Sequence, residues 1–205
     1  PAYMQKLKSC GVSFLDSGDE VLPAVLHYLG RSRTTTSATD YAEALAVLKS
    51  VRPFVRLFSS SGYINDMANG GVCVALGWSG DIDIARQRAI DNKTGQDIRV
   101  LVPKTGGLLF FDVMAIPKDA PHPRNAMKWI DYILRPEVDA GLTSKVFYAN
   151  PNVSSRKFIR PSLIDDPALF LKPEDMAHMA GPPERWDNEI RRLQNGAFVK
   201  FKTGA

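Results

Sequence analysis

The sequence predicts an α/β fold, in which strands alternate with helices along the chain. Short apolar runs bounded by Gly or Pro are typical of buried strands, and the segments between them carry apolar residues at helical spacing. The clearest case is the run 72–76, which Gly77 ends and which leads through a loop with Trp78 and Asp81 into a predicted helix. Open α/β sheets bind their ligands at such strand-to-helix loops. We therefore expect residues 72–81 to lie at the centre of the functional site.

The elements of the first half follow from local signals. Residues 9–14 alternate enough to predict a strand. Asp16 or Ser17 can then cap a helix that has acidic residues in its first turn and stops at Gly30. The same kinds of signal predict helices at 41–51, 63–68 and 82–90 and strands at 54–58 and 72–76, the last of which we expect to be central and buried.

In the second half, residues 98–102 and 108–116 are predicted strands joined by a Pro- and Gly-containing link. Residues 121–134 predict a helix, because Ala126, Trp129 and two isoleucines fall on one face. Further along we expect a short helix at 136–142, an extended piece at 145–148 and a helix at 186–193.

Composition excludes several classes of protein. With 205 residues, 44% hydrophobic and 23% charged, the chain has an ordinary globular composition. No apolar run approaches the ~20 residues that span a bilayer, and no signal segment follows Pro1. The net charge is +4, but the 26 Lys and Arg residues are scattered rather than interleaved with aromatic rings, so we expect no nucleic-acid partner. A start at Pro rather than Met suggests a processed protein or a fragment.

Cys10 and Cys73 belong to no C-x-x-C pair and have no histidine cluster beside them, so we expect no zinc or other metal. Spacing alone leaves open whether they are free thiols or form a disulfide. The three histidines are isolated in the sequence, and we expect them to be structural or surface residues: His27, His122 and His178.

Two carboxylates lie beside aromatic residues: Asp81 near Trp78, and Asp112 directly after Phe110 and Phe111. Aromatic faces and carboxylates together predict a pocket for an organic cation. A plainer interpretation remains open for each residue. Trp78 could be a core residue, Asp81 could cap the following helix, and Asp112 could be a turn residue at a strand end.

Five separated segments then resemble one family. They are residues 10–16 (CGVSFLD), 63–66 (YIND), 75–81 (ALGWSGD), 110–113 (FFDV) and 146–150 (VFYAN). In this order they resemble the periplasmic putrescine/spermidine-binding proteins of bacterial ABC importers, from about Lys8 to the C-terminus. The resemblance implies a type II periplasmic-binding-protein fold, which has two lobes and a hinge.

The family chain is much longer, and the present chain resembles only its C-terminal portion. We expect residues 1–89 and 114–205 to form the second lobe and residues 90–113 to return to the first lobe, most of which is absent. The resemblance also implies a Cys10–Cys73 disulfide. Because half of the binding cleft would be missing, we expect the chain by itself to bind ligand weakly.

Carried over residue by residue, the family's ligand contacts fall on six positions: Glu20, Trp78, Asp81, Phe110, Asp112 and Tyr148. The carboxylates would accept hydrogen bonds from ammonium groups, and the rings would line the methylene chain. The resemblance implies a monomeric periplasmic receptor for putrescine, or for spermidine, that docks on an inner-membrane permease and needs no cofactor. Asp83 departs from the usual sequence, and its role stays open.

Two other functions remain. One is a polyamine sensor without transport, whose phenotype would survive deletion of the permease. The other is a hydrolase that uses Asp81 and Asp112 as paired carboxylates. The sequence contains no G-x-S-x-G elbow or phosphate loop, and we expect no enzyme activity.

Overall fold

The structure is a computed structural model that describes residues 2–181 and 187–204. The first half contains α1 (Ala2–Cys10), β1 (Val12–Phe14), α2 (Gly18–Tyr28), α3 (Ala38–Val51), the 3-10 turn η1 (Arg52–Phe54), β2 (Val55–Phe58), α4 (Tyr63–Ala68), β3 (Val74–Ala75) and α5 (Ser79–Asp91). The second half contains α6 (Pro123–Ile133), α7 (Pro136–Val146), η2 (Val153–Phe158), α8 (Pro161–Ile164), α9 (Pro173–Met176) and α10 (Asn188–Thr203). The predicted α/β class is confirmed.

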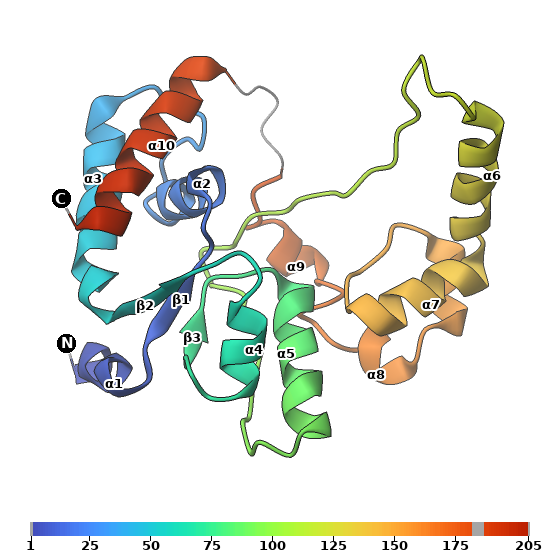
Figure 1. The fold of residues 1–205 in the computed structure, drawn as a ribbon, viewed down its shortest axis with the longest axis horizontal. Coiled ribbons are helices and arrows are strands. Elements are labelled where there is room, and N and C mark those ends of the chain that lie inside the picture. Colours follow the sequence, from blue (N-terminus) through green and yellow to red (C-terminus); the bar gives the residue numbers. More distant parts are fainter. Residues whose placement is uncertain (1, 182–186, 205) are drawn as a thin grey trace.

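A small parallel sheet organises the first half of the chain. Its strand order is β2–β1–β3, with Val12 paired to Val55 on one side and to Val74 on the other. Helices α4 and α5 lie on one side of the sheet, and α2, α3 and the returning α10 lie on the other (Figure 1). This arrangement places the C-terminal helix against the N-terminal half of the chain.

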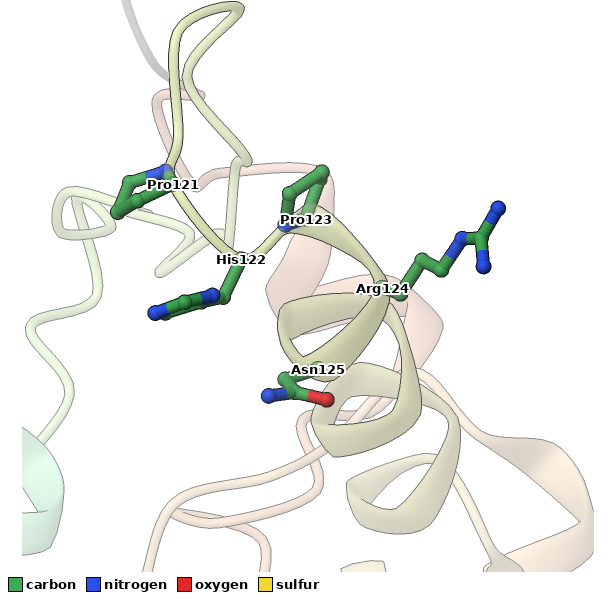
Figure 2. A pocket seen from close by; sticks show the side chains of 5 residues that line it. All are labelled: Pro121, His122, Pro123, Arg124 and Asn125. Atoms are coloured by element: carbon green, nitrogen blue, oxygen red, sulfur yellow. The ribbon is translucent and has the colours of Figure 1, made fainter.

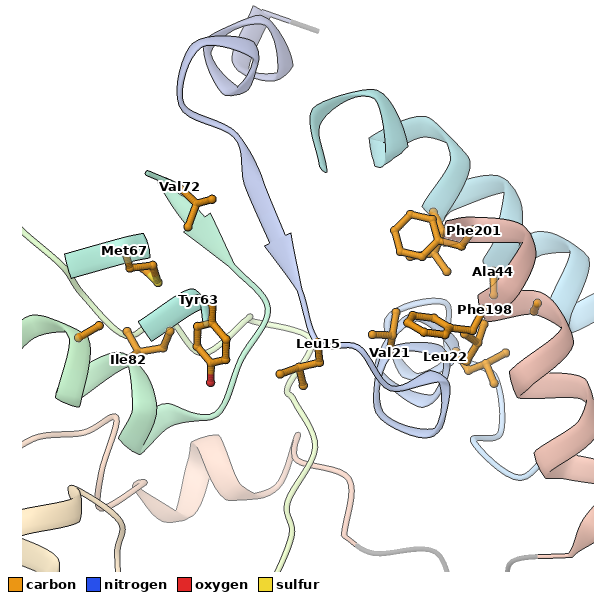
Figure 3. Packing of buried hydrophobic residues seen from close by; sticks show 14 of the residues in the cluster. Leu15, Val21, Leu22, Ala44, Tyr63, Met67, Val72, Ile82, Phe198 and Phe201 are labelled. Atoms are coloured by element: carbon orange, nitrogen blue, oxygen red, sulfur yellow. The ribbon is translucent and has the colours of Figure 1, made fainter. Parts of the chain in front are cut away.

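The main hydrophobic core fills both sides of this sheet. Leu15 follows β1 and lies between a group around Tyr63 and Ile82 and a group around Leu22 and Phe198 (Figure 3). Tyr63 and Leu22 are fully buried. Because burial of each such side chain contributes about 1.5–3 kcal/mol, this core holds α2, α4 and α5 at fixed positions.

A second, smaller core joins α7 and α8. Its buried residues are Ala140, Phe147, Ile159, Leu163 and Leu169. Ile84 packs against this core, whereas Ile82 on the same helix belongs to the main core. Helix α5 therefore contacts both cores.

The disulfide that the resemblance implied is confirmed. Cys10 and Cys73 are bonded, with their Cα atoms 5.4 Å apart, and together they tie the end of α1 to the start of β3. The prediction that residues 72–76 form a central buried strand is wrong. Only Val74 and Ala75 pair, at the edge of the sheet formed by the described residues, and Val74 is 45% exposed. The central strand is β1.

The predicted strands at 98–102 and 108–116 are also wrong. Between α5 and α6 the chain forms neither helix nor strand apart from one bridge, in which Leu108 pairs with Ala180. A strand needs a neighbour for its backbone hydrogen bonds, and within the described residues this segment has one only at the bridge. Several of its apolar residues are consequently open to solvent, such as Leu101 at 85% and Val113 at 83% exposure, whereas Ile98 is buried in the main core.

Several element ends differ from prediction. Residues 9 and 10 end α1 rather than begin a strand, and the predicted extended piece at 145–148 begins inside α7, which runs four residues past the expected end. That helix stops at Phe147, whose φ is +57°. Of the predicted helix 186–193, Trp186 lies outside the described residues, and α10 continues well beyond Leu193.

Candidate functional site

The carboxylate of Asp81 accepts hydrogen bonds from two tyrosine hydroxyl groups. Tyr63 donates to Oδ2 at 2.8 Å, and Tyr148 donates to Oδ1 at 2.9 Å. The Tyr63 hydroxyl also accepts a hydrogen bond from the backbone N–H of Trp78 at 3.2 Å. Each carboxylate oxygen has a second lone pair, so Asp81 keeps acceptor capacity for a further donor.

Local structure fixes Asp81 in this place. Helix α5 begins at Ser79 with Trp78 at the cap position, so Asp81 lies in the first turn, where the helix dipole stabilises a negative charge. The plainer interpretation of Asp81 as the helix cap is wrong, because Trp78 occupies that position. The dipole and the two hydroxyl donors make this carboxylate a preorganised acceptor.

Two glycines in the same loop let the tyrosine rings come close. A Cβ atom on Gly77 would lie 2.6 Å from the ring of Tyr63, and one on Gly80 would lie 2.3 Å from the ring of Tyr148. Both distances are too short for any side chain. The glycines therefore admit the tyrosine rings that hold Asp81.

Glu20 and Trp78 form a second polar contact. The indole Nε1 of Trp78 donates to Oε1 of Glu20 at 3.1 Å, and this joins α2 to the start of α5. The hydrogen bond turns the indole edge toward the carboxylate and fixes the orientation of the ring. Trp78 also packs partly against the main core, so the interpretation of Trp78 as a core residue is partly right.

Phe110 connects the aromatic residues. Its ring centroid lies 6.4 Å from that of Trp78 and 6.0 Å from that of Tyr148, in an edge-to-face arrangement with the latter. Asp112 is exposed two residues further on, and its charge contributes to raising the pKa of Tyr148. The structure thus links five of the six predicted ligand residues by hydrogen bonds or ring contacts, and the sixth, Asp112, lies two residues along the chain from Phe110.

The pKa shifts keep the hydroxyl donors protonated. Burial raises the pKa of Tyr63 far above its ordinary value, and the hydrogen bond to Asp81 raises it further. Burial and the charge of Asp81 likewise raise the pKa of Tyr148. Burial also raises the pKa of Glu20, although hydrogen bonds from Ser17 and Trp78 oppose that change. At neutral pH both phenols are therefore donors, and an ammonium group could offset the burial of Glu20.

Asp83 serves another contact. Its side chain is 3% exposed and pairs with Arg86 at 2.8 Å, while Arg86 also lies 3.6 Å from Asp166. This pairing connects α5 to the loop after α8. Asp83 therefore lies apart from the aromatic cluster, which answers the question that the sequence left open.

A separate pocket of about 310 Å³ lies at the start of α6 (Figure 2). It is lined by Pro121, His122, Pro123, Arg124 and Asn125, none of which is a predicted site residue. Among residues 2–181 and 187–204, no group of three or more His, Cys, Asp or Glu side chains could hold a metal ion. In the same residues, no helix has the length and apolar character needed to cross a membrane.

Sequence reasoning missed Tyr63, Gly77 and Gly80 as parts of the site. The sequence places Tyr63 at the start of a helix and in the segment 63–66 that carries the resemblance, and the signal that could have marked it as a site residue is its hydroxyl-bearing ring. The glycines stood in the loop that we placed at the centre of the site. Their role depends on rings that come from 14 residues before Gly77 and 68 residues after Gly80.

Comparisons with known proteins identify the family. The family described as bacterial extracellular solute-binding protein matches residues 12–178. The chain therefore belongs to the bacterial extracellular solute-binding proteins.

Individual relatives are more specific. The chain is 41% identical over 205 residues to the putrescine-binding periplasmic protein PotF of Escherichia coli (strain K12), matching all of this chain and 55% of that protein. It is 38% identical to the putrescine-binding periplasmic protein SpuD of Pseudomonas aeruginosa (strain UCBPP-PA14), with the same two coverages. The chain spans about half the length of these relatives. Both are named as binding proteins, not enzymes.

The fold has solved counterparts. The structure of the spermidine/putrescine ABC transporter substrate-binding protein PotD from Streptococcus pneumoniae matches with a TM-score of 0.79. The match covers 99% of this chain and 62% of that one, at 24% sequence identity. The predicted type II periplasmic-binding-protein fold is therefore confirmed, and this chain corresponds to part of that fold.

Proposed function

We propose that this chain forms part of a periplasmic receptor that captures a polyamine and delivers it to an inner-membrane ABC importer. Putrescine is the preferred ligand in this proposal, and spermidine is the alternative. Receptors of this kind release their ligand unchanged, so the proposal includes no catalysis. It further holds that the receptor acts as a monomer.

One observation carries the proposal: a carboxylate, Asp81, lies preorganised among three aromatic rings. Trp78, Phe110 and Tyr148 follow one another at centroid distances of 6.4 and 6.0 Å, and Tyr148 donates to Asp81. An ammonium group is costly to bury unless it is paired and hydrogen-bonded, and a carboxylate with free lone pairs meets that need. The rings offer apolar contact to methylene groups and their faces to the charge.

The other two acids suit the remaining ammonium groups. Glu20 is half-buried with a raised pKa, a condition that a neighbouring cation would relieve. Asp112 is exposed and has room to approach a ligand. In this proposal Asp81 and Trp78 form the fixed part of the site. Phe110 and Asp112 close on the ligand from the extended segment, residues 92–122, which connects α5 to α6.

The names of the relatives support the choice of ligand. Both are putrescine-binding proteins, and they match the whole of this chain. Since the match leaves 45% of each relative uncovered, we propose that the complete cleft needs a first lobe, with residues 90–113 returning to it and residues 1–89 and 114–205 in the second lobe. For the same reason we expect the 205-residue chain alone to bind weakly.

A calorimetric titration of the full-length protein that carries this chain tests the proposal. Putrescine, spermidine and n-butylamine would be compared at low salt, because n-butylamine keeps the methylenes of putrescine and lacks one ammonium group. We expect one-to-one binding of the polyamines, and binding of the monoamine at least about tenfold weaker, the equivalent of one charged hydrogen bond. Equal affinity for putrescine and n-butylamine would contradict recognition by paired carboxylates.

Two further observations separate the alternatives. Recovery of the ligand unchanged, checked by mass spectrometry after long incubation, would exclude the two-carboxylate hydrolase. Loss of polyamine uptake on deletion of the receptor would favour transport over a sensor.

A further inference from the structure

The position of Phe110 and Asp112 needs an explanation, because neither helix nor strand holds them. Residues 110–115 are all exposed. Immediately before them, however, the chain is fastened to a second segment. The backbone N–H of Leu109 donates to the carbonyl of Ala180 at 2.8 Å, and the N–H of Ala180 donates to the carbonyl of Gly107 at 2.9 Å. The location of Phe110 thus depends on the location of residues 178–181.

That second segment is in turn held by two side chains, the imidazole of His27 and the guanidinium of Arg33. Nε2 of His27 lies 3.0 Å from the carbonyl oxygen of His178, and Nη2 of Arg33 donates to the carbonyl oxygen of Gly181. A carbonyl only accepts hydrogen bonds, so Nε2 of His27 carries the hydrogen in this contact. The two accepting carbonyls are three residues apart in the sequence. The two contacts therefore fix residues 178–181 against α2 and the loop that follows it.

Helix α2 connects this contact to the site. His27 follows Glu20 by seven residues, which is two helical turns, so both side chains lie on the same face of α2. The helix is anchored by Leu22 and Leu26, which are both fully buried. One rigid helix therefore presents the carboxylate of Glu20 at one end and the contact to residues 178–181 at the other.

Gly106 shows how closely the pieces fit. Its φ is +82°, and a Cβ atom there would lie 1.8 Å from the carbonyl oxygen of His178 and 3.1 Å from Nε2 of His27. No other residue type fits at this approach. Gly106, residues 178–181 and α2 thus meet at the His27–His178 hydrogen bond.

From this arrangement we infer that His27 and Arg33 are positioning residues for the ligand site: they hold residues 178–181, which place Phe110 and Asp112 opposite Trp78 and Asp81. This role rests on the proposed function, because it concerns the same site. Neither His27 nor Arg33 touches the ligand in it.

The first test needs no ligand. Hydrogen exchange at the amides of Leu109 and Ala180 is measured in the full-length protein. The variants are His27→Ala, His27→Gln and Arg33→Met. We expect exchange about five- to tenfold faster in His27→Ala and Arg33→Met, because the segment opens more often. Gln can donate from its amide to the same carbonyl, so His27→Gln should restore slow exchange. The matched controls, His122→Ala and Arg124→Met, change exposed residues at the start of α6 and should have no effect.

The second test is affinity for putrescine. We expect His27→Ala and Arg33→Met each to bind about fivefold more weakly or worse, with His27→Gln close to wild type. The direction of the change in affinity is informative for Arg33→Met, because removal of a positive charge would by itself strengthen binding of a cationic ligand. Weaker binding in that variant would therefore show that residues 178–181 have lost their position, since the change in charge acts in the opposite direction.

The two tests separate failure of the inference from failure of the proposed function. A wild-type protein that binds no polyamine, together with the expected exchange pattern, would refute the function and keep the positioning of the segment. Unchanged exchange in both His27→Ala and Arg33→Met would overturn the inference, whatever the ligand. If His27→Ala fails to fold, the pair Arg33→Met and Arg33→Lys gives the same decision, since Lys can still donate to the Gly181 carbonyl.

Discussion

The two central carboxylates of the proposed site, Asp81 and Asp112, lie in regions of opposite character. Asp81 lies in the first turn of a helix that packs on both cores, and two tyrosine hydroxyls donate hydrogen bonds to its oxygens at 2.8 and 2.9 Å. Asp112 is exposed on an extended segment that is fastened at the Leu108–Ala180 bridge. One acid is fixed by its surroundings, and the other is placed by a few backbone contacts.

The difference matters for binding. A preorganised group contributes to affinity without an ordering cost, whereas an exposed segment must be ordered when it closes on a ligand. We therefore expect changes near Asp81 to affect stability and affinity together. Changes near Asp112 should affect affinity alone. The predictions below test this contrast, beginning with the largest expected effect.

Loss of the disulfide should lower the stability of the packed region around the sheet and leave the segment around Asp112 unaffected. The Cys10→Ser, Cys73→Ser double variant opens a 63-residue separation, and the chain-entropy model then predicts a loss of roughly 4 kcal/mol in the free energy of unfolding. Urea unfolding of both proteins, with hydrogen exchange at Leu109 as the internal control, measures this. Faster exchange at Leu109 under native conditions would contradict the prediction, because it would show that the two regions are not independent.

Gly80→Ala tests whether the tyrosine ring needs the space at the start of α5. A Cβ there would lie 2.3 Å from the ring of Tyr148, so we expect a loss of about 1–3 kcal/mol and weaker putrescine binding. Gly141→Ala in α7 is the matched control, because nothing lies within 4 Å of its Cβ position and alanine favours a helix by about 0.5–1 kcal/mol. Opposite signs in thermal unfolding are expected; a stabilising Gly80→Ala would mean that the ring can move away freely.

Tyr148→Phe removes one of the two hydroxyl donors to Asp81. We expect a loss of about 1.5 kcal/mol in the free energy of unfolding, the usual contribution of a hydrogen bond to a charged group. Tyr132→Phe is the control, because Tyr132 is exposed and its ring contacts Trp129. Equal stability of the two variants in urea would show that Asp81 does not depend on Tyr148.

The smallest effect is a pH dependence from Glu20. Burial raises its pKa above the ordinary value of 4.5, so the folded chain binds this proton more tightly than the unfolded chain does. The contribution of Glu20 to stability therefore falls as pH rises through the interval just above 4.5. An ammonium ligand favours the ionised carboxylate, so affinity for putrescine should rise through the same interval.

Glu20→Gln should remove both pH slopes, and Glu174→Gln, an exposed residue of α9, should leave them. Unfolding and titration series between about pH 4 and 7 would reveal them. A slope that persists unchanged in Glu20→Gln would assign the titration to another group.

Local signals predicted much of the fold and part of the site. Helix α4 is confirmed at residues 63–68, because its apolar spacing and the Asn-Gly-Gly that follows it are local features. The strand predicted at 108–116 failed, because pairing depends on a partner that the sequence of the segment does not contain. The Cys10–Cys73 bond came from the family resemblance, since spacing alone had left it open.

The inner structure of the site was least predictable. The hydrogen bond from Tyr63 to Asp81 spans 18 residues, and that from Tyr148 to Asp81 spans 67. Such contacts arise only when the sheet and both cores have assembled. The sequence pattern could name Asp81 and its neighbouring aromatic, but not the hydroxyl groups that hold it.

The most direct test compares Asp81→Asn and Asp112→Asn in one calorimetric series with putrescine, alongside thermal unfolding of the free proteins. Each variant removes one charge with little change in shape, so each should weaken binding by about tenfold or more. We predict that Asp81→Asn also lowers the unfolding temperature, since Tyr63 and Tyr148 lose their ionised acceptor, whereas Asp112→Asn leaves it unchanged. Wild-type affinity for putrescine in Asp81→Asn would contradict the account at its centre.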